Sequence, residues 1–317
     1  MLTLPQTGEV RAVSASALAS ASSVVLLLSL SLAAAPARAQ TTDVIGVRAQ
    51  GMGGAFTAVA DDATAWWWNP AGLAGGPFFN AVLEFDRPDT STDDSVRGVS
   101  VAYPALGFTY YRLPLRQIRV SASTETLATI RQDDEALRVY GATVGQSFGN
   151  HLVVGSTVKL LQANDFNVTL DAGVMASFGP ARIGLVLRDL TEPSFHSDAG
   201  VELFKLERGA RAGFALSSGR RGAIGSATFS VDADLTTSHD PLLGDERVIA
   251  VGAEAWSQGN KLGIRGGFRS NRATDQGVLY SGGLSFAVRN GTFVDAFFSG
   301  GGDDVRQGWG FALRVTF

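Results

Sequence analysis

The stretch GVRAQGMGGAFTAVADDATAWWWNPAGLAGG, residues 46–76, decides the fold that we predict. Its distinctive residues are, in order, Gly51, Gly53, Gly54, Asp61, Asp62, Trp66, Trp67, Trp68, Asn69 and Pro70. Glycines let backbone pass close to a surface. Asp61 can cap a short helix, and Asn69-Pro70 would end it. We expect a segment that the rest of the chain encloses; the alternative is an ordinary packed terminal arm.

The chain from Phe78 to Phe317 alternates in polarity with period two, which is typical of β-strands. In the closing segment one face would carry Trp309, Phe311, Leu313, Val315 and Phe317, and the other Gly308, Gly310, Ala312, Arg314 and Thr316. Membrane strands alternate in this way between lipid and lumen. The sequence therefore predicts an all-β fold, a transmembrane antiparallel up-and-down β-barrel of about 14 strands.

The strand boundaries follow from the same alternation. We predict strands at residues 78–86, 95–103, 106–113, 136–149, 151–163, 166–178, 181–189, 205–217, 223–234, 247–258, 261–270, 277–289, 292–299 and 307–317. The segment 118–130 either extends the third strand or forms another one. Every second connection is a tight turn such as Asn290-Gly291, whereas most of the others are longer and acidic. Outer-membrane barrels have this layout of short turns and long loops.

The N-terminus and the composition indicate export. Residues 24–32 form a short apolar core and Ala37-Arg38-Ala39 a cleavage site, so residues 1–39 are predicted to be a signal peptide; an uncleaved anchor is the alternative. The 38 glycines and the lack of cysteine suit an exported barrel, and the net charge of -4 argues against a nucleic-acid partner. The predicted organisation is a signal peptide at 1–39, a plug at 40–76 and a barrel at 77–317.

Charged residues on the predicted inward face suggest how the plug is held. They are Lys159, Arg182, Arg188, Asp232, Glu254, Arg265, Arg269 and Arg314. We expect Asp61 and Asp62 to pair with some of these arginines, unless they only cap a helix and meet water. The candidate plug and lumen residues are Asp61, Asp62, Asn69, Pro70, Arg182, Arg265 and Arg314. Phe56, Trp66, Trp67 and Trp68 would line an apolar passage, pack the plug against the wall, or do both.

Catalysis and metal binding have little support in this sequence. His151, His196 and His239 fall in different connections, and no paired motif suggests a nucleophile with its base. The acidic loops either hold divalent cations against lipopolysaccharide phosphates or are simply solvated, and their Asp-Asp pairs lack the spacing of a calcium loop. We predict a protein that is not an enzyme and uses no cofactor or metal, with outer-membrane lipid and lipopolysaccharide as its surroundings.

The stretch RAQGMGGAFTAVADDATAWWWNPAGLA, residues 48–74, resembles the N-terminal signature of the FadL/TodX and PorV/PorQ group of outer-membrane proteins. The shared features are Gly-Met-Gly-Gly, Ala-Asp-Asp-Ala and Asn-Pro-Ala-Gly, and Phe317 is similar to the C-terminal aromatic that the barrel-insertion machinery recognises. The resemblance implies a 14-stranded barrel whose N-terminal segment folds back into the lumen. It implies uptake of small hydrophobic compounds for FadL-like members. For PorV-like members it implies service in a protein-secretion system, binding cargo or partner barrels. A purely structural barrel is a third possibility.

Overall fold

A computed structural model describes residues 45–88, 95–114, 136–163, 165–196, 202–220, 222–240, 244–274, 277–301 and 307–317. The predicted signal peptide, the segment 118–130 and most of the acidic loop residues lie outside this part of the chain. Within it, no helix is both long and apolar enough to cross a membrane.

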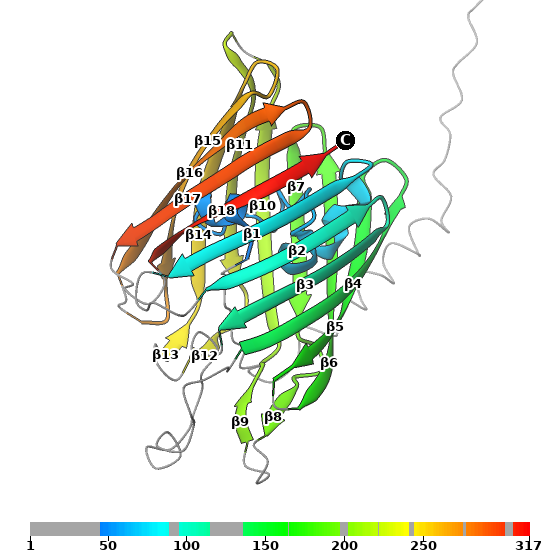
Figure 1. Cartoon of the computed structure of the whole chain (residues 1–317), viewed down its shortest axis with the longest axis vertical. Helices are drawn as coiled ribbons and strands as arrows, with labels where there is room; N and C mark the ends of the chain where they lie inside the picture. Colours follow the sequence, from blue (N-terminus) through cyan, green and yellow to red (C-terminus); the bar gives the residue numbers. More distant parts are fainter. Residues whose placement is uncertain are drawn as a thin grey trace, which may run out of the picture. The chain divides into compact units, whose positions relative to one another are not determined.

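Fourteen strands form one closed antiparallel barrel (Figure 1). They are β1 (Asn80–Pro88), β2 (Val96–Tyr103), β3 (Leu106–Pro114), β4 (Ala136–Phe148), β5 (Leu152–Gln162), β6 (Phe166–Phe178), β7 (Ala181–Arg188), β10 (Gly209–Ser218), β11 (Ile224–Asp234), β14 (Val248–Ser257), β15 (Leu262–Asn271), β16 (Val278–Arg289), β17 (Thr292–Gly301) and β18 (Gly308–Thr316). Each pairs with the next barrel strand along the chain, and β1 closes against β18. The predicted fold is therefore confirmed, with strand ends shifted by a few residues.

Two small hairpins in the longer connections were not predicted. One is β8 (Ser194–His196) with β9 (Glu202–Lys205), and the other is β12 (Ser238–Asp240) with β13 (Gly244–Glu246). Strands this short span about one repeat of the alternation, so polarity along the sequence does not reveal them.

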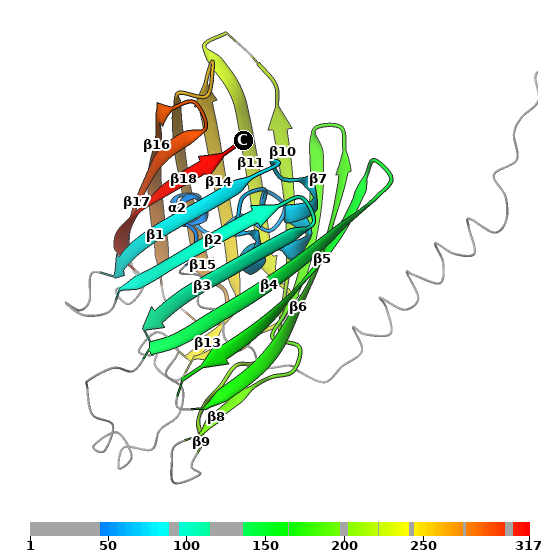
Figure 2. The ribbon, with the colours of Figure 1, turned by 45° about the vertical axis from the view of Figure 1, so that its right-hand side comes forward.

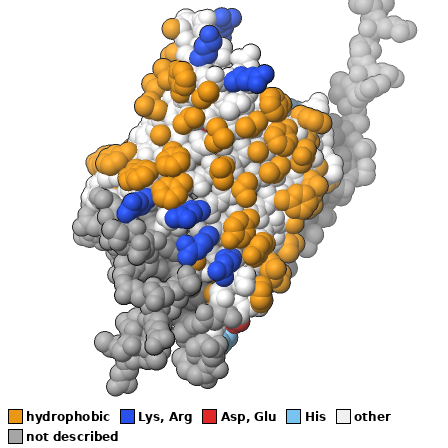
Figure 3. Space-filling view, in the orientation of Figure 1, with side chains coloured by type: hydrophobic (Ala, Val, Ile, Leu, Met, Phe, Trp, Pro, Cys, Tyr) orange, Lys and Arg blue, Asp and Glu red, His pale blue; other side chains and the backbone are white. Residues whose placement is uncertain are grey.

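The alternation places apolar side chains on the outer face of the barrel. In β18, Trp309, Phe311 and Leu313 are exposed, whereas the residues between them are buried toward the lumen. The inward positions predicted for charged residues of β7, β11 and β15 are likewise confirmed; these residues are Arg182, Arg188, Asp232, Arg265 and Arg269. Figure 3 shows apolar side chains spread over the front face of the wall. A barrel surface of this kind is suited to hydrocarbon rather than to water.

The plug, residues 45–76 in the described part of the chain, lies inside the barrel (Figure 2). Its regular elements are short: α2 (Val47–Gly51), α3 (Ala65–Trp68) and the 3-10 helix η1 (Pro70–Gly75). Helix α2 packs against β15 to β18, and η1 packs against β3 to β6. The plug thus contacts two separate arcs of the wall, so its side chains and those of the wall share one core.

Candidate functional site: the plug and its contacts with the lumen

Asn69 organises the C-terminal half of the plug. Its extended backbone ends α3, and its side-chain oxygen accepts a hydrogen bond from the backbone nitrogen of Ala71, 3.2 Å away, in the first turn of η1. Its Nδ2 donates to the carbonyl oxygens of Thr57 at 2.9 Å and Val174 at 3.2 Å. The predicted helix end at Asn69-Pro70 is confirmed, and the same amide also fastens the plug to β6.

The start of α3 differs from the prediction, because Thr64 and not Asp61 is its N-cap residue, and Asp62 binds Thr64. The Oδ1 atom of Asp62 accepts hydrogen bonds from the backbone nitrogen and the hydroxyl of Thr64, at 2.9 Å and 2.5 Å. Asp62 is buried, whereas the Asp61 side chain is 39% exposed. Of the two aspartates, therefore, only Asp62 is buried and hydrogen-bonded to a residue beside α3.

Wall side chains satisfy backbone groups of the plug that regular secondary structure leaves without partners. Both oxygens of Glu84 accept hydrogen bonds from the plug, at 3.0 Å from the nitrogen of Gly46 and 3.2 Å from that of Val47. Asp232 accepts from the nitrogens of Phe56 and Thr57 at 2.9 and 2.7 Å. A buried amide without a partner is costly. The wall therefore specifies the irregular path of the plug.

Glycines on the inward face of the wall make room for the plug backbone. A Cβ atom at Gly252 or Gly267 would overlap the main chain of Met52, and one at Gly173 would overlap the side chain of Asn69. Gly53 lies over Gly267 with a φ of +67°, a conformation that favours glycine. Glycines therefore allow the backbones of plug and wall to approach closely, as expected, and they do so both in the plug and in the wall.

Arg48 of α2 joins the plug to the wall by a buried ion pair. Its Nε and Nη2 lie 2.8 and 2.7 Å from the two carboxylate oxygens of Glu254 on β14, so the pair is bidentate. Its Nη1 contacts Asp61, and lies 3.4 Å from Asp62. Burial opposes the charge, but the carboxylates of Asp61 and Glu254 outweigh it and hold the pKa of Arg48 well above its usual value. Arg48 therefore stays charged.

The expected pairing of Asp61 and Asp62 with wall arginines is corrected by these contacts. Both aspartates meet an arginine of the plug itself, and the wall contributes the anion, Glu254. The predicted lumen arginines Arg265 and Arg314 instead contact wall carboxylates, and Arg182 is half-buried on the inward face near the tight-turn end of β7. At this contact the plug therefore supplies the cation and the wall supplies the anion, which is the reverse of the prediction.

Beyond Glu254, further ion pairs run from strand to strand along the inward face of the wall. Arg265 on β15 lies 3.3 Å from Glu254 and 3.6 Å from Asp295 on β17. Asp295 in turn lies 2.8 Å from Arg314 on β18. Positive and negative groups therefore alternate from Arg48 to Arg314, and each carboxylate faces two cations. We call the pairs of Arg48, Glu254, Arg265, Asp295 and Arg314 the latch.

A second charge cluster surrounds the tryptophans. Lys159 lies 2.9 Å from Asp171 and 2.7 Å from Asp189, and its Nζ is 5.5 Å from the ring centre of Trp67. The guanidinium of Arg188 lies over Trp67 and Trp68, at 5.4 and 5.5 Å. The predictions omitted Asp171, although it falls on the inward face of β6 two residues before Gly173. Alternation along that strand would have found it.

The four aromatic residues that are candidates for lining a passage are packed within the plug and against the wall. Their side chains are 0 to 8% exposed. Trp66 lies 5.4 Å from Trp67 and 5.1 Å from Tyr111 of β3, and Phe56 lies 6.1 Å from Trp68, between ring centres. Of the two interpretations of these residues, interior packing is the one that describes this conformation.

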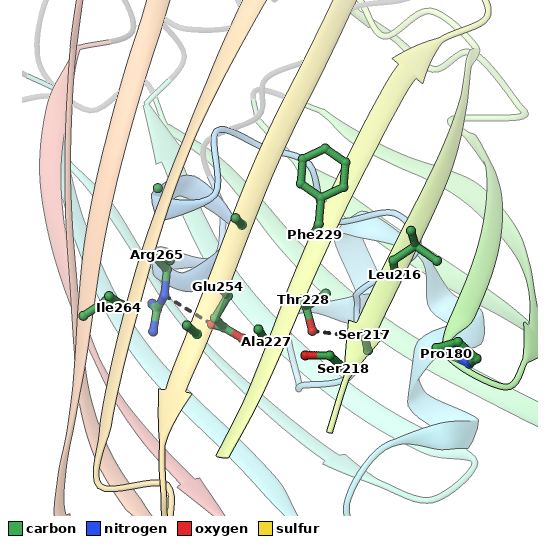
Figure 4. A pocket seen from close by; sticks show the side chains of 13 residues that line it. Pro180, Leu216, Ser217, Ser218, Ala227, Thr228, Phe229, Glu254, Ile264 and Arg265 are labelled. Atoms are coloured by element: carbon green, nitrogen blue, oxygen red, sulfur yellow. Dashed lines mark hydrogen bonds and ion pairs between the residues drawn. The ribbon is translucent and has the colours of Figure 1, made fainter. Parts of the chain in front are cut away.

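A cavity of about 670 Å³ lies on the lipid-facing side of β10, β11, β14 and β15 (Figure 4). Its rim includes Leu216, Phe229 and Ile264, which are 44, 45 and 53% exposed, and small residues such as Ala253 form its floor. Strand pairing behind it is continuous, with Glu254 opposite both Thr228 and Arg265. The cavity is therefore a depression in the outer surface and not a gap in the wall.

Comparison with known proteins finds the same fold in solved structures that share little sequence identity with this chain. The structure is similar to the CymD monoaromatic hydrocarbon channel, with a TM-score of 0.56 and 11% identity, covering 86% of this chain and 98% of that one. It is also similar to the Ralstonia pickettii toluene transporter TbuX, with a TM-score of 0.53 and 13% identity, covering 87% and 99% of the two chains. The family described as "F plasmid transfer operon, TraF, protein" matches residues 157–234. None of the curated proteins matches the sequence.

Proposed function

We propose that this outer-membrane barrel admits small hydrophobic compounds and that the plug is its gate. The observation that carries the proposal is the plug itself, an irregular segment inside the barrel whose α2 is joined to the wall by the ion pair of Arg48 with Glu254. The fold it shares with two proteins described as a hydrocarbon channel and a toluene transporter supports the choice of substrate class.

The chemistry of the plug suits an apolar substrate. Displacing α2 would separate Arg48 from Glu254 and uncover aromatic surface, since Phe56 and Trp68 lie in ring contact just beyond it. Apolar and aromatic walls with few polar groups favour lipophilic ligands. Arg265 and Arg314 of the wall are meanwhile paired with wall carboxylates, so an anion in transit would compete with existing partners.

Uptake by whole cells tests the proposal. A host that lacks its own hydrocarbon channels is supplied with the full chain, and the initial uptake rate of radiolabelled toluene is measured against cells that carry an unrelated barrel of similar size. We expect a faster rate that unlabelled xylene suppresses by competition. Equal rates in the two strains would exclude hydrophobic uptake. A faster rate without competition would indicate a leak and not a guided route.

The alternative of an accessory protein in a secretion system stays a prediction. Neither structure reported above is described as a secretion component. Co-purification of exported cargo or partner barrels with the full chain would favour it over uptake.

A further inference from the structure

A row of arginines crosses the outer face of the barrel on β2, β3 and β4. Arg97 stands directly opposite Arg112, and Arg112 directly opposite Arg138. Arg87 lies on the same face of the neighbouring β1, two residues beyond Phe85, which is the register partner of Arg97. All of them occur near the strand ends that lead into the longer connections. Figure 3 shows basic side chains gathered along a diagonal between the apolar surface and the grey residues.

The side chains of this row point away from the lumen. Arg97 is exposed and Arg112 and Arg138 are half-buried, while the residues on either side of each along the strand are buried toward the plug. The row of arginines ends at β4. The register partner of Arg138 on β5 is the uncharged Gln162, and the nearby outward residues of β6 are the exposed Phe166 and Val168.

The aromatic residues beneath the row indicate its depth in the membrane. Tyr110 and Tyr140 share the outward face with Arg112 and Arg138, lie one step closer to the membrane centre, and have ring centres 5.1 Å apart. Their exposed fractions are 37 and 40%. Tyrosines of membrane barrels gather in girdles at the interface between hydrocarbon and headgroups. The arginines therefore lie at headgroup level, on the side of the longer loops.

Three adjacent arginines are unfavourable without an anion between them. Directly opposed strand residues lie about 5 Å apart, and like charges in that arrangement repel. Arg97 donates from Nε to the Ser95 hydroxyl at 3.0 Å, and its guanidinium lies 5.5 Å from the Phe85 ring centre. Within the described ranges, no ion pair joins a carboxylate to Arg97, Arg112 or Arg138. The row thus concentrates positive charge where outer-leaflet phosphates lie.

We propose that Arg97, Arg112 and Arg138 bind the phosphorylated headgroup of one lipopolysaccharide molecule, whose acyl chains lie on the apolar surface beneath. Guanidinium groups bind phosphate oxygens in bidentate fashion, and a row of three spans the width of a phosphorylated sugar headgroup rather than a single phosphate. The exposed Val99, Tyr110 and Tyr140 continue the same face toward the membrane centre and form the surface on which the chains would lie.

Lipid binding to the delipidated, detergent-solubilised full chain tests this site by native mass spectrometry. The probe is purified lipid A, compared with lipid A from which the phosphates have been removed and with phosphatidylglycerol. The variant combines Arg112→Gln with Arg138→Gln. The matched control combines Arg247→Gln with Arg272→Gln, two exposed arginines at the same end of the barrel on the other side.

We expect the unmodified chain to bind lipid A in preference to both comparison lipids. The variant should bind it about 30-fold more weakly (~2 kcal/mol at 1.4 kcal/mol per tenfold), since each arginine near an anionic lipid surface contributes on that scale, and the control should be unchanged. Equal losses in variant and control, or binding of lipid A that does not depend on its phosphates, would overturn the proposal. If the variant does not fold, the comparison of lipid A with its dephosphorylated form on the unmodified chain still tests the proposal.

Discussion

Arg48 has carboxylates on two sides, and the two sides differ in burial. Glu254 is 2% exposed at the side chain and holds the guanidinium with two hydrogen bonds, whereas Asp61 is 39% exposed. Water screens the second contact far more than the first. The attachment of α2 to the wall therefore depends on Glu254, and the two carboxylates are separable by mutation.

Glu254→Gln should loosen the plug. The substitution removes the buried charge that faces both Arg48 and Arg265, and breaking a buried pair in this way costs about 3 kcal/mol or more. We expect a higher single-channel conductance in planar bilayers and a lower thermal unfolding midpoint, measured by the mobility shift of the folded barrel on gels.

Asp61→Asn is the matched control for that experiment. It keeps the shape of the side chain and leaves the contact between Arg48 and Glu254 intact, so the change in stability should stay below about 1 kcal/mol. Equal effects of the two substitutions on conductance would contradict the assignment of Glu254 as the main anchor.

At the scale of elements, Met52 at the C-cap of α2 packs directly on a glycine of the wall, and a larger side chain at that glycine would displace it. Gly252→Leu would place a side chain where the Met52 carbonyl lies. We expect it to displace residues 51–54 and raise the conductance, at a cost of about 1–3 kcal/mol of overpacking. Gly282→Leu is the control, because Gly282 faces lipid and its nearest non-neighbouring atom would be 4.0 Å away. Unchanged conductance in the Gly252 variant would show that α2 is not seated as the structure describes.

The inward and outward faces of the wall strands can be predicted from the sequence, whereas the contacts of the plug cannot. Side chains alternate along any strand, so the inward position of Arg265 and the outward position of Phe268 follow from their spacing alone. The partner of Arg48 lies 206 residues away along the chain, and it is set by the register of fourteen strands and the path of an irregular segment. One signal was available: Glu254 stands between alanines on an inward face, where a charge needs a counter-charge.

For the whole molecule, the two ends of the plug are held differently. Gly75 ends η1 only a few residues before β1 begins at Asn80, so that end is covalently tied to the wall. The end that carries α2 is held by the latch and by hydrogen bonds to Glu84. In a plug that moves as one rigid body, η1 would therefore act as the hinge and α2 would move away from the wall.

A reversible cross-link at η1 tests this geometry, and the absence of native cysteine makes it specific. A Cβ atom at Gly145 on β4 would lie 3.1 Å from that of Ala74, which is within small adjustments of the separation of about 3.8 Å in a disulfide. The variant combines Ala74→Cys with Gly145→Cys. A hinge at this end would stay in contact with the wall, so we expect the oxidised barrel to take up labelled toluene at the rate of the same barrel reduced with dithiothreitol. A loss of uptake on oxidation that dithiothreitol reverses would show that η1 itself must leave the wall. Each single-cysteine variant, treated with the same oxidant, controls for effects of oxidation alone.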